Sequence, residues 1–368
     1  MPAKKNVSWF RKANEKRARI WRAMSRTYHQ RTGKKPYDLI RIEREFLSSL
    51  YLKAAARLGL EVHEIGRVLR FSANGKLFHV WKTTTELDHF PFYAITEDKV
   101  LVRKLFQESG FAVPEGCDFG WQDHSAAVAY ALSLGRPCVI KPAMETSGGL
   151  GVTTRLTKRA EIARAFRYAG LFAHQVLVEE FLPGDSYRFL VHKGRCLSVL
   201  RRELPTVTGN GVSTVKELVE AENCNRPLAP DWHVGDPLSV PMPIDSAASR
   251  HLKRQGVGWK SIPRSGEKVH LASASNLAFG CTYSEVLQKT HPELIRMSEQ
   301  AAASLGLQIA GVDIIAAHID APEGHIIEIN IAPGIEAHYM VTNPADATDP
   351  IGAFLTDYFE LGKANTLG

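Results

Sequence analysis

The stretch that most constrains the fold is residues 311–334, in which oxygen-bearing side chains interrupt two apolar runs. Residues 309–319 and 326–331 are rich in β-branched side chains, which indicates strands, and the Asp-Ala-Pro-Glu-Gly sequence between them indicates a turn. The sequence therefore predicts an antiparallel hairpin. Because strand side chains alternate between two faces, every second residue of each strand is expected to share a face.

Three polar residues lie on this hairpin: Asp313, Glu328 and Asn330. We expect Asp313 roughly opposite Asn330, with Glu328 on the same face. Burying carboxylates costs free energy unless a cation neutralises them, and a set of oxygen ligands favours Mg²⁺ or Mn²⁺ over Zn²⁺. The alternative is that Asp313 caps a turn and Glu328 pairs with an arginine at a sheet edge. The hairpin alone leaves both open.

Length and composition indicate a globular chain of two or three subdomains, with 368 residues, 44% hydrophobic and 23% charged. The five cysteines are scattered without a paired CxxC spacing, which is typical of reduced thiols. No apolar run approaches the length of a membrane span, and the N-terminus lacks the apolar core of a signal peptide. We therefore expect a cytoplasmic protein with no membrane partner.

The net charge of +7 is concentrated at the N-terminus. Residues 1–36 hold twelve Lys or Arg and one acid, Glu15, which leaves the rest of the chain at −4, since this stretch alone carries +11. Apolar side chains recur among these basic residues at partly helical spacing, so a basic helical extension is expected. It could contact nucleic acid, an acidic peptide or an anionic membrane surface, or pack on its own chain or on a second copy.

Periodicity predicts the other elements in order. Residues 37–58 have helical spacing, and an Asn-Gly pair at positions 74–75 between apolar runs predicts a hairpin. A long helix begins near Thr96, which is expected as its N-cap. Further helices are predicted at 125–134 and 160–169. Further strands are predicted at 138–140, 176–180, 187–191 and 196–201, with a turn at Lys193 and Gly194.

A lysine and a glycine-rich loop follow the strand at 138–140. Lys141 precedes a loop that contains Gly148, Gly149 and Gly151, where backbone amides can approach phosphate oxygens without side-chain interference. No GKS or GKT sequence follows, so this is not a Walker motif. A glycine-rich turn without a ligand is the alternative. The strand at 176–180 then runs into acids and a Pro-Gly turn, which could present backbone groups to an adenine edge.

Together these motifs resemble the ATP-grasp superfamily of carboxylate ligases. The resemblance is closest to the ATP-grasp part of cyanophycin synthetase and of bifunctional glutathione synthetases, and it runs from about Thr96 to Met340. TEDKVLVRKLFQESGFAVPEG, CVIKP with SGGLGV, VEEFLPG, GVDII and IIEINIAPG occur in the family's order. RRELPTVTGNGVSTVKELVEAEN, residues 201–223, is the most specific signature of the subgroup.

The resemblance implies an α+β fold, in which two subdomains grip ATP behind a small α/β pre-ATP-grasp domain. It implies boundaries at 1–36 for the basic extension, 37–95 for the small domain and 96–360 for the grasp. The grasp would divide into a nucleotide-flap subdomain near 115–185 and a magnesium and substrate subdomain near 186–360. The glutamate-ligase and C-terminal ligase modules of the relatives are absent, so a stand-alone enzyme is expected.

The resemblance also assigns roles residue by residue. Phosphate contacts would come from Lys99, Lys141 and the loop glycines Gly148, Gly149 and Gly151. Adenine would be lined by Glu179, Glu180 and Leu182. Mg²⁺, one or two ions, would be held by Asp313, Glu328 and Asn330. The catalytic residues would be Arg188, Arg202 and Lys141, and the substrate side would include Asn276, Gly334 and His338.

Two departures from the family's pattern bear on these roles. The relatives carry an acid two residues after the hinge glycine, where this chain has Ser186 preceded by Asp185, and which of the two contacts the ribose is left open. His270 and Ala272 replace a basic stretch, which implies a changed substrate pocket. His338 is also open: it could act as a base toward an amine or be structural.

The resemblance implies that a substrate carboxylate attacks the γ-phosphorus of ATP and that an amine then displaces phosphate from the acyl phosphate. The substrates would be an amino acid, a small peptide or a specialised metabolite. One alternative is a ligase that modifies a ribosomal peptide held by the basic helix. Another is a catalytically inactive ATP-binding or nucleic-acid-associated protein, although the two lysines and three metal ligands favour catalysis. Nucleic acid is an unlikely partner by this reasoning, and a homodimer is possible by analogy.

Overall fold

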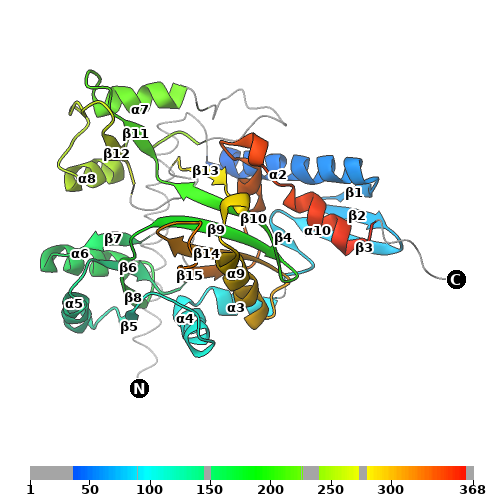
Figure 1. The fold of residues 1–368 in the computed structure, drawn as a ribbon, viewed down its shortest axis with the longest axis horizontal. Helices are drawn as coiled ribbons and strands as arrows, with labels where there is room; N and C mark the ends of the chain where they lie inside the picture. Colours follow the sequence, from blue (N-terminus) through cyan, green and yellow to red (C-terminus); the bar gives the residue numbers. More distant parts are fainter. Residues whose placement is uncertain are drawn as a thin grey trace. The chain divides into compact units, whose positions relative to one another are not determined.

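The computed structural model describes residues 36–88, 90–144, 151–224, 226, 240–272 and 280–361 (Figure 1). Within them the helices are Pro36–Leu58 (α2), Phe90–Thr96 (α3), Lys99–Glu108 (α4), His124–Ser133 (α5), Arg159–Ala169 (α6), Val215–Cys224 (α7), Ser246–Arg254 (α8), Pro292–Ser304 (α9) and Pro350–Tyr358 (α10), with 3-10 turns at Leu287–Lys289 (η2), Ile335–Tyr339 (η3) and Pro344–Asp346 (η4). The strands are Glu61–Ile65 (β1), Val68–Ala73 (β2), Lys76–Trp81 (β3), Thr84–Thr85 (β4), Gly116–Gly120 (β5), Cys138–Pro142 (β6), Thr153–Leu156 (β7), Gln175–Glu180 (β8), Asp185–His192 (β9), Arg195–Glu203 (β10), Thr206–Thr208 (β11), Lys268–His270 (β12), Thr282–Glu285 (β13), Ile309–Ala316 (β14) and His325–Asn330 (β15).

The chain forms two compact units, which are described separately. Among the described residues, the first unit holds 36–43, 97–100, 114–144 and 151–182, and the second holds 44–96, 101–113 and the described residues after 182. All strand pairs in both units are antiparallel. In each unit one face of the main sheet packs in an apolar core.

The first unit is a four-stranded sheet in the order β5-β8-β6-β7, covered on one face by α5 and α6. Ile140 and Val178 from the strands pack with Val128 of α5 and Phe166 of α6, and all four side chains are buried. Since neighbouring strand residues point to opposite faces, the residue after Ile140 lies on the other face of this sheet. That residue is Lys141.

The second unit is built on a five-stranded sheet in the order β13-β10-β9-β14-β15. One face is apolar: Phe189, Val199 and Val312 pack in one core with Leu294 of α9 and Phe106 of α4. The side chains that alternate with these residues point to the opposite face. This face carries most of the charged residues that the motifs singled out.

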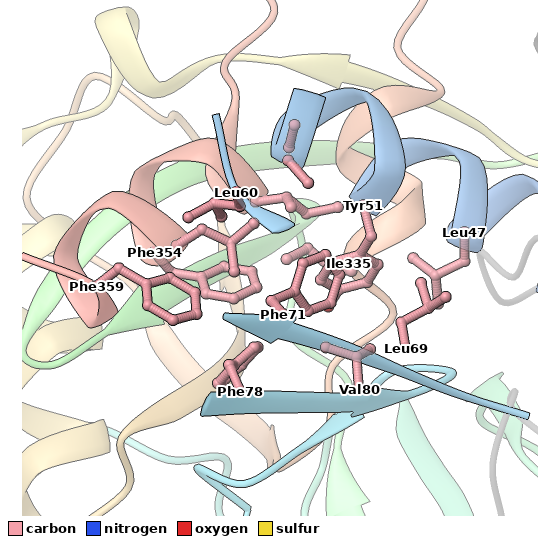
Figure 2. Packing of buried hydrophobic residues seen from close by; sticks show 14 of the residues in the cluster. Leu47, Tyr51, Leu60, Leu69, Phe71, Phe78, Val80, Ile335, Phe354 and Phe359 are labelled. Carbon is pink, nitrogen blue, oxygen red and sulfur yellow. The ribbon is translucent and has the colours of Figure 1, made fainter. Parts of the chain in front are cut away.

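A second core joins α2 and the β1-β2-β3-β4 sheet to the C-terminal helix α10. Figure 2 shows Tyr51, Phe71 and Phe78 gathered against Phe354 and Phe359, all fully buried. Leu190 and Ile309 of the central sheet belong to the same cluster. The segment predicted as a pre-ATP-grasp domain therefore shares its core with the second unit, since its buried aromatic side chains pack on α10.

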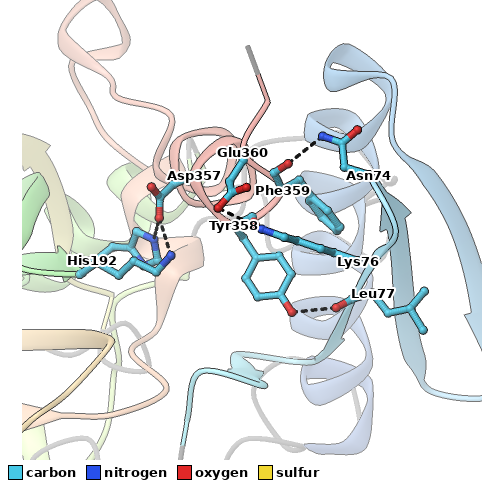
Figure 3. A network of polar contacts seen from close by, with 9 residues as sticks. Asn74, Lys76, Leu77, His192, Asp357, Tyr358, Phe359 and Glu360 are labelled. Carbon is cyan, nitrogen blue, oxygen red and sulfur yellow. Dashed lines mark hydrogen bonds and ion pairs between the residues drawn. The ribbon is translucent and has the colours of Figure 1, made fainter. Parts of the chain in front are cut away.

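Polar contacts also tie the β2–β3 turn to the end of α10 (Figure 3). The Asn74 side-chain amide donates to the Phe359 carbonyl oxygen at 2.9 Å, and the Tyr358 hydroxyl donates to the Leu77 carbonyl oxygen at 2.8 Å. On the other side of α10, Asp357 accepts from Lys193 at 2.7 Å and lies 3.1 Å from the ring of buried His192. These contacts join segments more than 150 residues apart in the sequence.

A smaller cluster lies between β10 and β13 in the chain. The two-stranded sheet of β11 and β12 packs its Val207 and Val269 side chains with Val215 and Val219 of α7 and with Leu252 of α8. The cluster includes part of residues 201–223, the segment that most specifically marks the subgroup.

Several expected elements are confirmed. The helix predicted at 37–58 is α2, and the Asn-Gly pair forms the β2–β3 turn with both residues at positive φ, 50° and 71°. The turn at Lys193 and Gly194 joins β9 to β10 in the same way, with φ of 45° and 72°. Such residues suit a two-residue hairpin because the turn needs positive φ at both positions.

Two expectations were wrong. Thr96 is not the N-cap of the long helix but the last residue of α3, and the backbone amide of Val100 in α4 is instead bonded to the Asp98 side chain at 3.0 Å. In the β14–β15 hairpin, Asp313 lies opposite Glu328, and Gly311 lies opposite Asn330. The pairing is displaced because the hairpin turns closer to residue 320 than expected. Ile315 pairs with His325, and the bulge after Asp313 then shifts the pairing by one residue, to Glu328.

No helix within the described ranges is long and apolar enough to span a membrane. The basic segment of residues 1–35 lies outside the described residues, so the predicted N-terminal helix stays a prediction.

Candidate active site

The polar face of the central sheet carries a charged residue on each of its five strands. The register aligns Glu285, Leu200, Arg188, Asp313 and Glu328 in one row across β13, β10, β9, β14 and β15. A neighbouring row contains Tyr283, Arg202 and Ser186, and the row on the other side contains Ser198, Leu190, Gly311 and Asn330. Residues two apart on a strand share a face, so these rows form one continuous polar surface.

Asp313 is the centre of this surface. Its carboxylate is buried, with 1% of the residue exposed, and accepts hydrogen bonds from two guanidinium groups. Arg188 binds it through Nε to Oδ1 and through Nη2 to Oδ2 at 2.9 Å, while Arg202 Nη2 donates to Oδ1 at 2.7 Å. The fork of Arg188 therefore makes the bidentate pairing that aligns a guanidinium with a carboxylate.

The electrostatics follow from this pairing. Burial alone would raise the pKa of Asp313, but the guanidinium groups of Arg188 and Arg202 hold it below its usual value. Burial would likewise lower the pKa of Arg188, and the Asp313 carboxylate raises it. Two cations thus share one buried anion, with Glu328 as a further negative charge acting on Arg188.

The predicted metal ligands fit a hard cation by their chemistry. The Asp313 and Glu328 carboxylates and the Asn330 side-chain oxygen lie on one face, and all are oxygen donors of the kind Mg²⁺ takes. A carboxylate offers about four lone-pair positions. The hydrogen bonds of Asp313 to Arg188 and Arg202 use three of them, which leaves one on Oδ2 among the described residues. Asn330 Nδ2 is buried and has no hydrogen-bond partner among the described residues.

Within the residues that the structure describes, there is no group of three or more His, Cys, Asp or Glu side chains suited to a metal ion. The predicted set has two carboxylates and one amide, so its ligand role stays a prediction. The alternative in which Asp313 caps a turn is wrong, because Asp313 lies within β14. It is Asp313 that pairs with the arginines.

Lys141 and Glu179 form a buried ion pair in the first unit. Lys141 Nζ lies 2.6 Å from Glu179 Oε2, and the two residues are 9% and 4% exposed. Both side chains lie on the face of the sheet away from the α5–α6 core. Gly116 of β5, directly opposite Glu179, makes room for this pair, since a Cβ there would lie 2.7 Å from Glu179 Cγ. Lys141 is thus a buried cation that can exchange Glu179 for another anion.

The structure also brings the two predicted phosphate lysines close along the backbone. The amide of Lys99 donates to the Ala143 carbonyl oxygen at 3.0 Å, two residues beyond Lys141. Gly151 has a φ of 81°, and a Cβ at this position would lie 2.6 Å from Pro142, so glycine is required for both reasons. Gly148 and Gly149 lie outside the described residues.

The side chains of the residues predicted to line adenine point in different directions. Glu179 faces Lys141, whereas the Glu180 side chain points to the opposite face, accepting from the Glu115 amide at 2.8 Å and pairing with Arg136 at 3.2 Å. The Glu180 carboxylate is therefore engaged away from Glu179, and the Glu180 backbone amide donates to the Glu115 carbonyl oxygen at 2.8 Å. Leu182 is 9% exposed and ends the first unit.

The two ribose candidates also point to opposite faces. Asp185 pairs with Arg201 at 2.7 Å, with both side chains more than 40% exposed. Ser186 lies on the polar face with Arg188. Among the predicted substrate residues, Gly334 precedes η3 and Asn276 lies outside the described ranges.

His338, the third predicted substrate residue, is held from behind by residues that the motifs did not single out. Its Nδ1 is hydrogen-bonded to the Ser198 hydroxyl, which also bonds to the Glu285 carboxylate. All three residues are at most 2% exposed. Ser198 and Glu285 escaped sequence reasoning because a serine in an apolar strand and a lone glutamate are common. The only available signal was the polar residue at alternate positions of otherwise buried strands.

Known proteins resemble this chain in sequence and in fold. The family model for the carbamoyl-phosphate synthase L chain, ATP binding domain, matches residues 98–188. The chain is 30% identical over 329 residues to the glutathione biosynthesis bifunctional protein of Clostridium perfringens, covering 86% of this chain and 41% of the relative. It is 32% identical over 247 residues to the cyanophycin synthetase of Geminocystis herdmanii, covering 66% of this chain and 28% of the relative.

A solved structure gives the same picture. The crystal structure of a bifunctional glutathione synthetase from Pasteurella multocida matches with a TM-score of 0.57 and 25% sequence identity, over 84% of this chain and 43% of that one. The chain spans less than half the length of each of these relatives.

Proposed function

We propose that this chain, which belongs to the ATP-grasp superfamily of carboxylate ligases, activates a substrate carboxylate with ATP and joins it to an amine. The products are an amide, ADP and phosphate. The single observation that carries the proposal is the pair of partly buried guanidinium groups bonded to buried Asp313, which lies opposite the carboxylate of Glu328 in the sheet. A ligase that handles phosphate and an acyl phosphate needs such fixed positive charge.

The roles of the chain's residues follow from charge and position. Lys99 and Lys141, with the loop glycines, are proposed to hold ATP phosphates. Lys141 would exchange its present pairing with Glu179 for a phosphate oxygen. The backbone from Glu179 to Leu182 is proposed to line adenine, with Asp185 or Ser186 at the ribose. Phosphoryl transfer of this kind depends on positioning and charge neutralisation rather than on a protein nucleophile.

On the central sheet, Asp313, Glu328 and Asn330 are proposed to hold Mg²⁺, with Mn²⁺ as a substitute. The ion when bound supplies positive charge to the β- and γ-phosphates. Arg188 is proposed to orient the transferred phosphate. Arg202 is proposed to stabilise the acyl phosphate and then the oxyanion of the tetrahedral intermediate. Asp313 positions both arginines, because its two oxygens accept from both guanidinium groups.

The domain boundaries are proposed as predicted: a basic extension to residue 36, a small domain from 37 to 95, and the grasp from 96 to 360. The substrate class is proposed to be an amino acid, a small peptide or a specialised metabolite. The names of the relatives in the comparisons, glutathione and cyanophycin enzymes, support amino-acid substrates.

The direct test is ADP release by the purified chain with Mg²⁺ and pooled amino acids and dipeptides, followed by mass analysis of the products. We expect ADP release that depends on both a carboxylate and Mg²⁺. Glu328→Gln is the variant of choice, since it keeps the side-chain volume and leaves the Arg188–Asp313 pair in place. It is expected to abolish the Mg²⁺-dependent activity. His318→Gln, on the exposed end of the same hairpin, is the matched control. Full activity in Glu328→Gln would contradict the metal assignment.

A further inference from the structure

The buried histidine next to the polar face, His338, has one ring nitrogen without a hydrogen-bond partner among the described residues. His338 is fully buried, its Nδ1 is bonded to Ser198, and its Nε2 has no hydrogen-bond partner within the described part of the chain. A buried polar atom without a partner costs about 1–3 kcal/mol. An atom in this position therefore indicates a partner that the described residues do not supply.

The residues behind His338 determine which kind of partner Nε2 can take. Glu285 is buried, its Oε1 accepts from the backbone amides of Val199 at 2.9 Å and Leu287 at 3.0 Å, and its Oε2 lies against the Ser198 hydroxyl. In all three contacts Glu285 is the acceptor. The Ser198 hydroxyl then donates to Glu285, and its oxygen accepts from His338 Nδ1–H. This fixes the neutral tautomer in which Nε2 carries a lone pair.

The charges around His338 determine its protonation state. Burial, and then the positive charges of Arg188 and Arg202, lower the pKa of His338 from 6.5 to about 3. The ring is therefore neutral at physiological pH, and Nε2 remains an acceptor. The two arginines that act on the ring are the ones bonded to Asp313. Ser198, which bonds to the ring, lies on the same strand and the same sheet face as Arg202.

Among the reactants of the proposed reaction, few can donate to this atom. ATP phosphates, a substrate carboxylate and an acyl phosphate present only acceptor oxygens, which Nε2 repels. An amine has N–H donors. The positive field of the arginines also disfavours a charged ammonium and favours the free amine, which is the form that can attack an acyl phosphate.

We propose that His338 Nε2 accepts a hydrogen bond from the attacking amine, and that Glu285 and Ser198 are positioning residues that hold the ring in the required tautomer. This inference rests on the proposed ligase function and adds to it a site for the second substrate. It concerns binding and orientation of the neutral amine before it attacks.

Two substitutions at His338 separate the two ring nitrogens. In His338→Asn, the side-chain amide can replace Nδ1 as the donor to Ser198 but places nothing at Nε2. In His338→Gln, the longer side chain can place an acceptor oxygen at the Nε2 position. We therefore expect Asn to lower kcat/KM for the amine about tenfold, the value of one hydrogen bond, and Gln to recover at least part of it. His318→Asn is the exposed control.

Hydroxylamine serves as the amine probe, with the carboxylate found in the ADP screen. Hydroxamate formation measures the amine step, and ADP release without any amine measures carboxylate activation. The inference predicts that His338→Asn loses hydroxamate formation and keeps ADP release without an amine. Equal loss of both, or wild-type hydroxamate kinetics in His338→Asn, overturns the inference while leaving the ligase function intact. If the wild type forms neither ADP nor hydroxamate with any carboxylate, the proposed function itself fails.

A measurement without substrate tests the tautomer. In the full chain with ¹⁵N-labelled histidine, the resonances lost in His338→Asn are expected to report a neutral ring protonated at Nδ1. Ser198→Ala is expected to shift the ring toward the Nε2–H form and to lower kcat/KM for hydroxylamine several-fold. An Nε2–H tautomer in the wild type would make the atom a donor and would refute the proposal.

Discussion

Replacing Asp313 by Asn tests the charge balance of the polar face. The substitution keeps the shape of the side chain but removes the only anion bonded to both Arg188 and Arg202 within the described residues. It also points amide hydrogens at groups that are donors only. The structure therefore predicts a substantial loss of stability.

The magnitude follows from burial. Removing one partner of a buried ion pair costs about 3–5 kcal/mol. The two arginine side chains retain 17% and 15% exposure, so partial hydration places the expected loss near the lower limit, about 3 kcal/mol. With a urea dependence of about 1–3 kcal/mol per molar, the unfolding midpoint should fall by about 1–3 M. The pKa of Asp313 is lowered, so its contribution is present above its usual value of 3.8 and is lost on acidification below that. The loss should therefore be constant between about pH 5 and pH 8.

The assay is urea unfolding followed by tryptophan fluorescence, with two comparison variants. Adding Arg188→Gln to Asp313→Asn removes one unpaired cation, so the double variant should lose about 1–3 kcal/mol less than the sum of the single losses. Arg57→Gln breaks an exposed pair with Asp349 and should cost less than about 1 kcal/mol. An Asp313→Asn midpoint equal to that of Arg57→Gln would refute the idea that Asp313 neutralises buried charge.

Three further outcomes are expected. His338→Gln should make the free energy of unfolding depend less on pH between 7 and 5. The folded pKa of His338, about 3, lies below the usual 6.5, so the wild type loses about 2 kcal/mol of stability over this range. The urea midpoints at the two pH values should therefore differ less in the variant than in the wild type. Gly116→Ala should destabilise the first unit by about 1–3 kcal/mol and lower ATP affinity, because the new Cβ would lie 2.6 Å from Val178 O. Gly258→Ala, with open space around the added Cβ, is the control and should change neither quantity. Calorimetric melting and ATP titration measure both variants. Lys141→Met should weaken ATP binding at least about tenfold and leave Glu179 as an unpaired buried acid, so equal ATP affinity in titration calorimetry would contradict the phosphate role of Lys141.

The family resemblance drawn from the motifs is confirmed by the comparisons, and the reason is local. A Lys-Pro strand end, a glycine loop and a polar hairpin are short stretches that can be recognised from the residue types and their order along the chain. Hairpins with Asn74-Gly75 or Lys193-Gly194 are likewise predictable, because the turn itself requires positive φ at both positions.

Register and side-chain direction were less predictable. The chain turns back earlier than expected between β14 and β15, and with the one-residue bulge after Asp313 this places Glu328, and not Asn330, opposite Asp313. The side chain of Asp98, and not that of Thr96, bonds to the first turn of α4. A bulge depends on how a strand fits its neighbours on both sides, and one residue of displacement changes every pairing beyond it. Sequence reasoning supplied the right residue types for this hairpin but not their partners.

The sequence by itself determined the family, the strand-turn-strand segments and the identity of the charged residues, since these depend on local composition and spacing. Only the tertiary structure decided what those charges do for one another. Arg188, Arg202 and Asp313 come from three strands up to 125 positions apart, and Ser198 meets His338 across 140. Charge pairing and tautomer choice depend on distances through space in a buried setting, and the order of residues along the chain does not specify those distances.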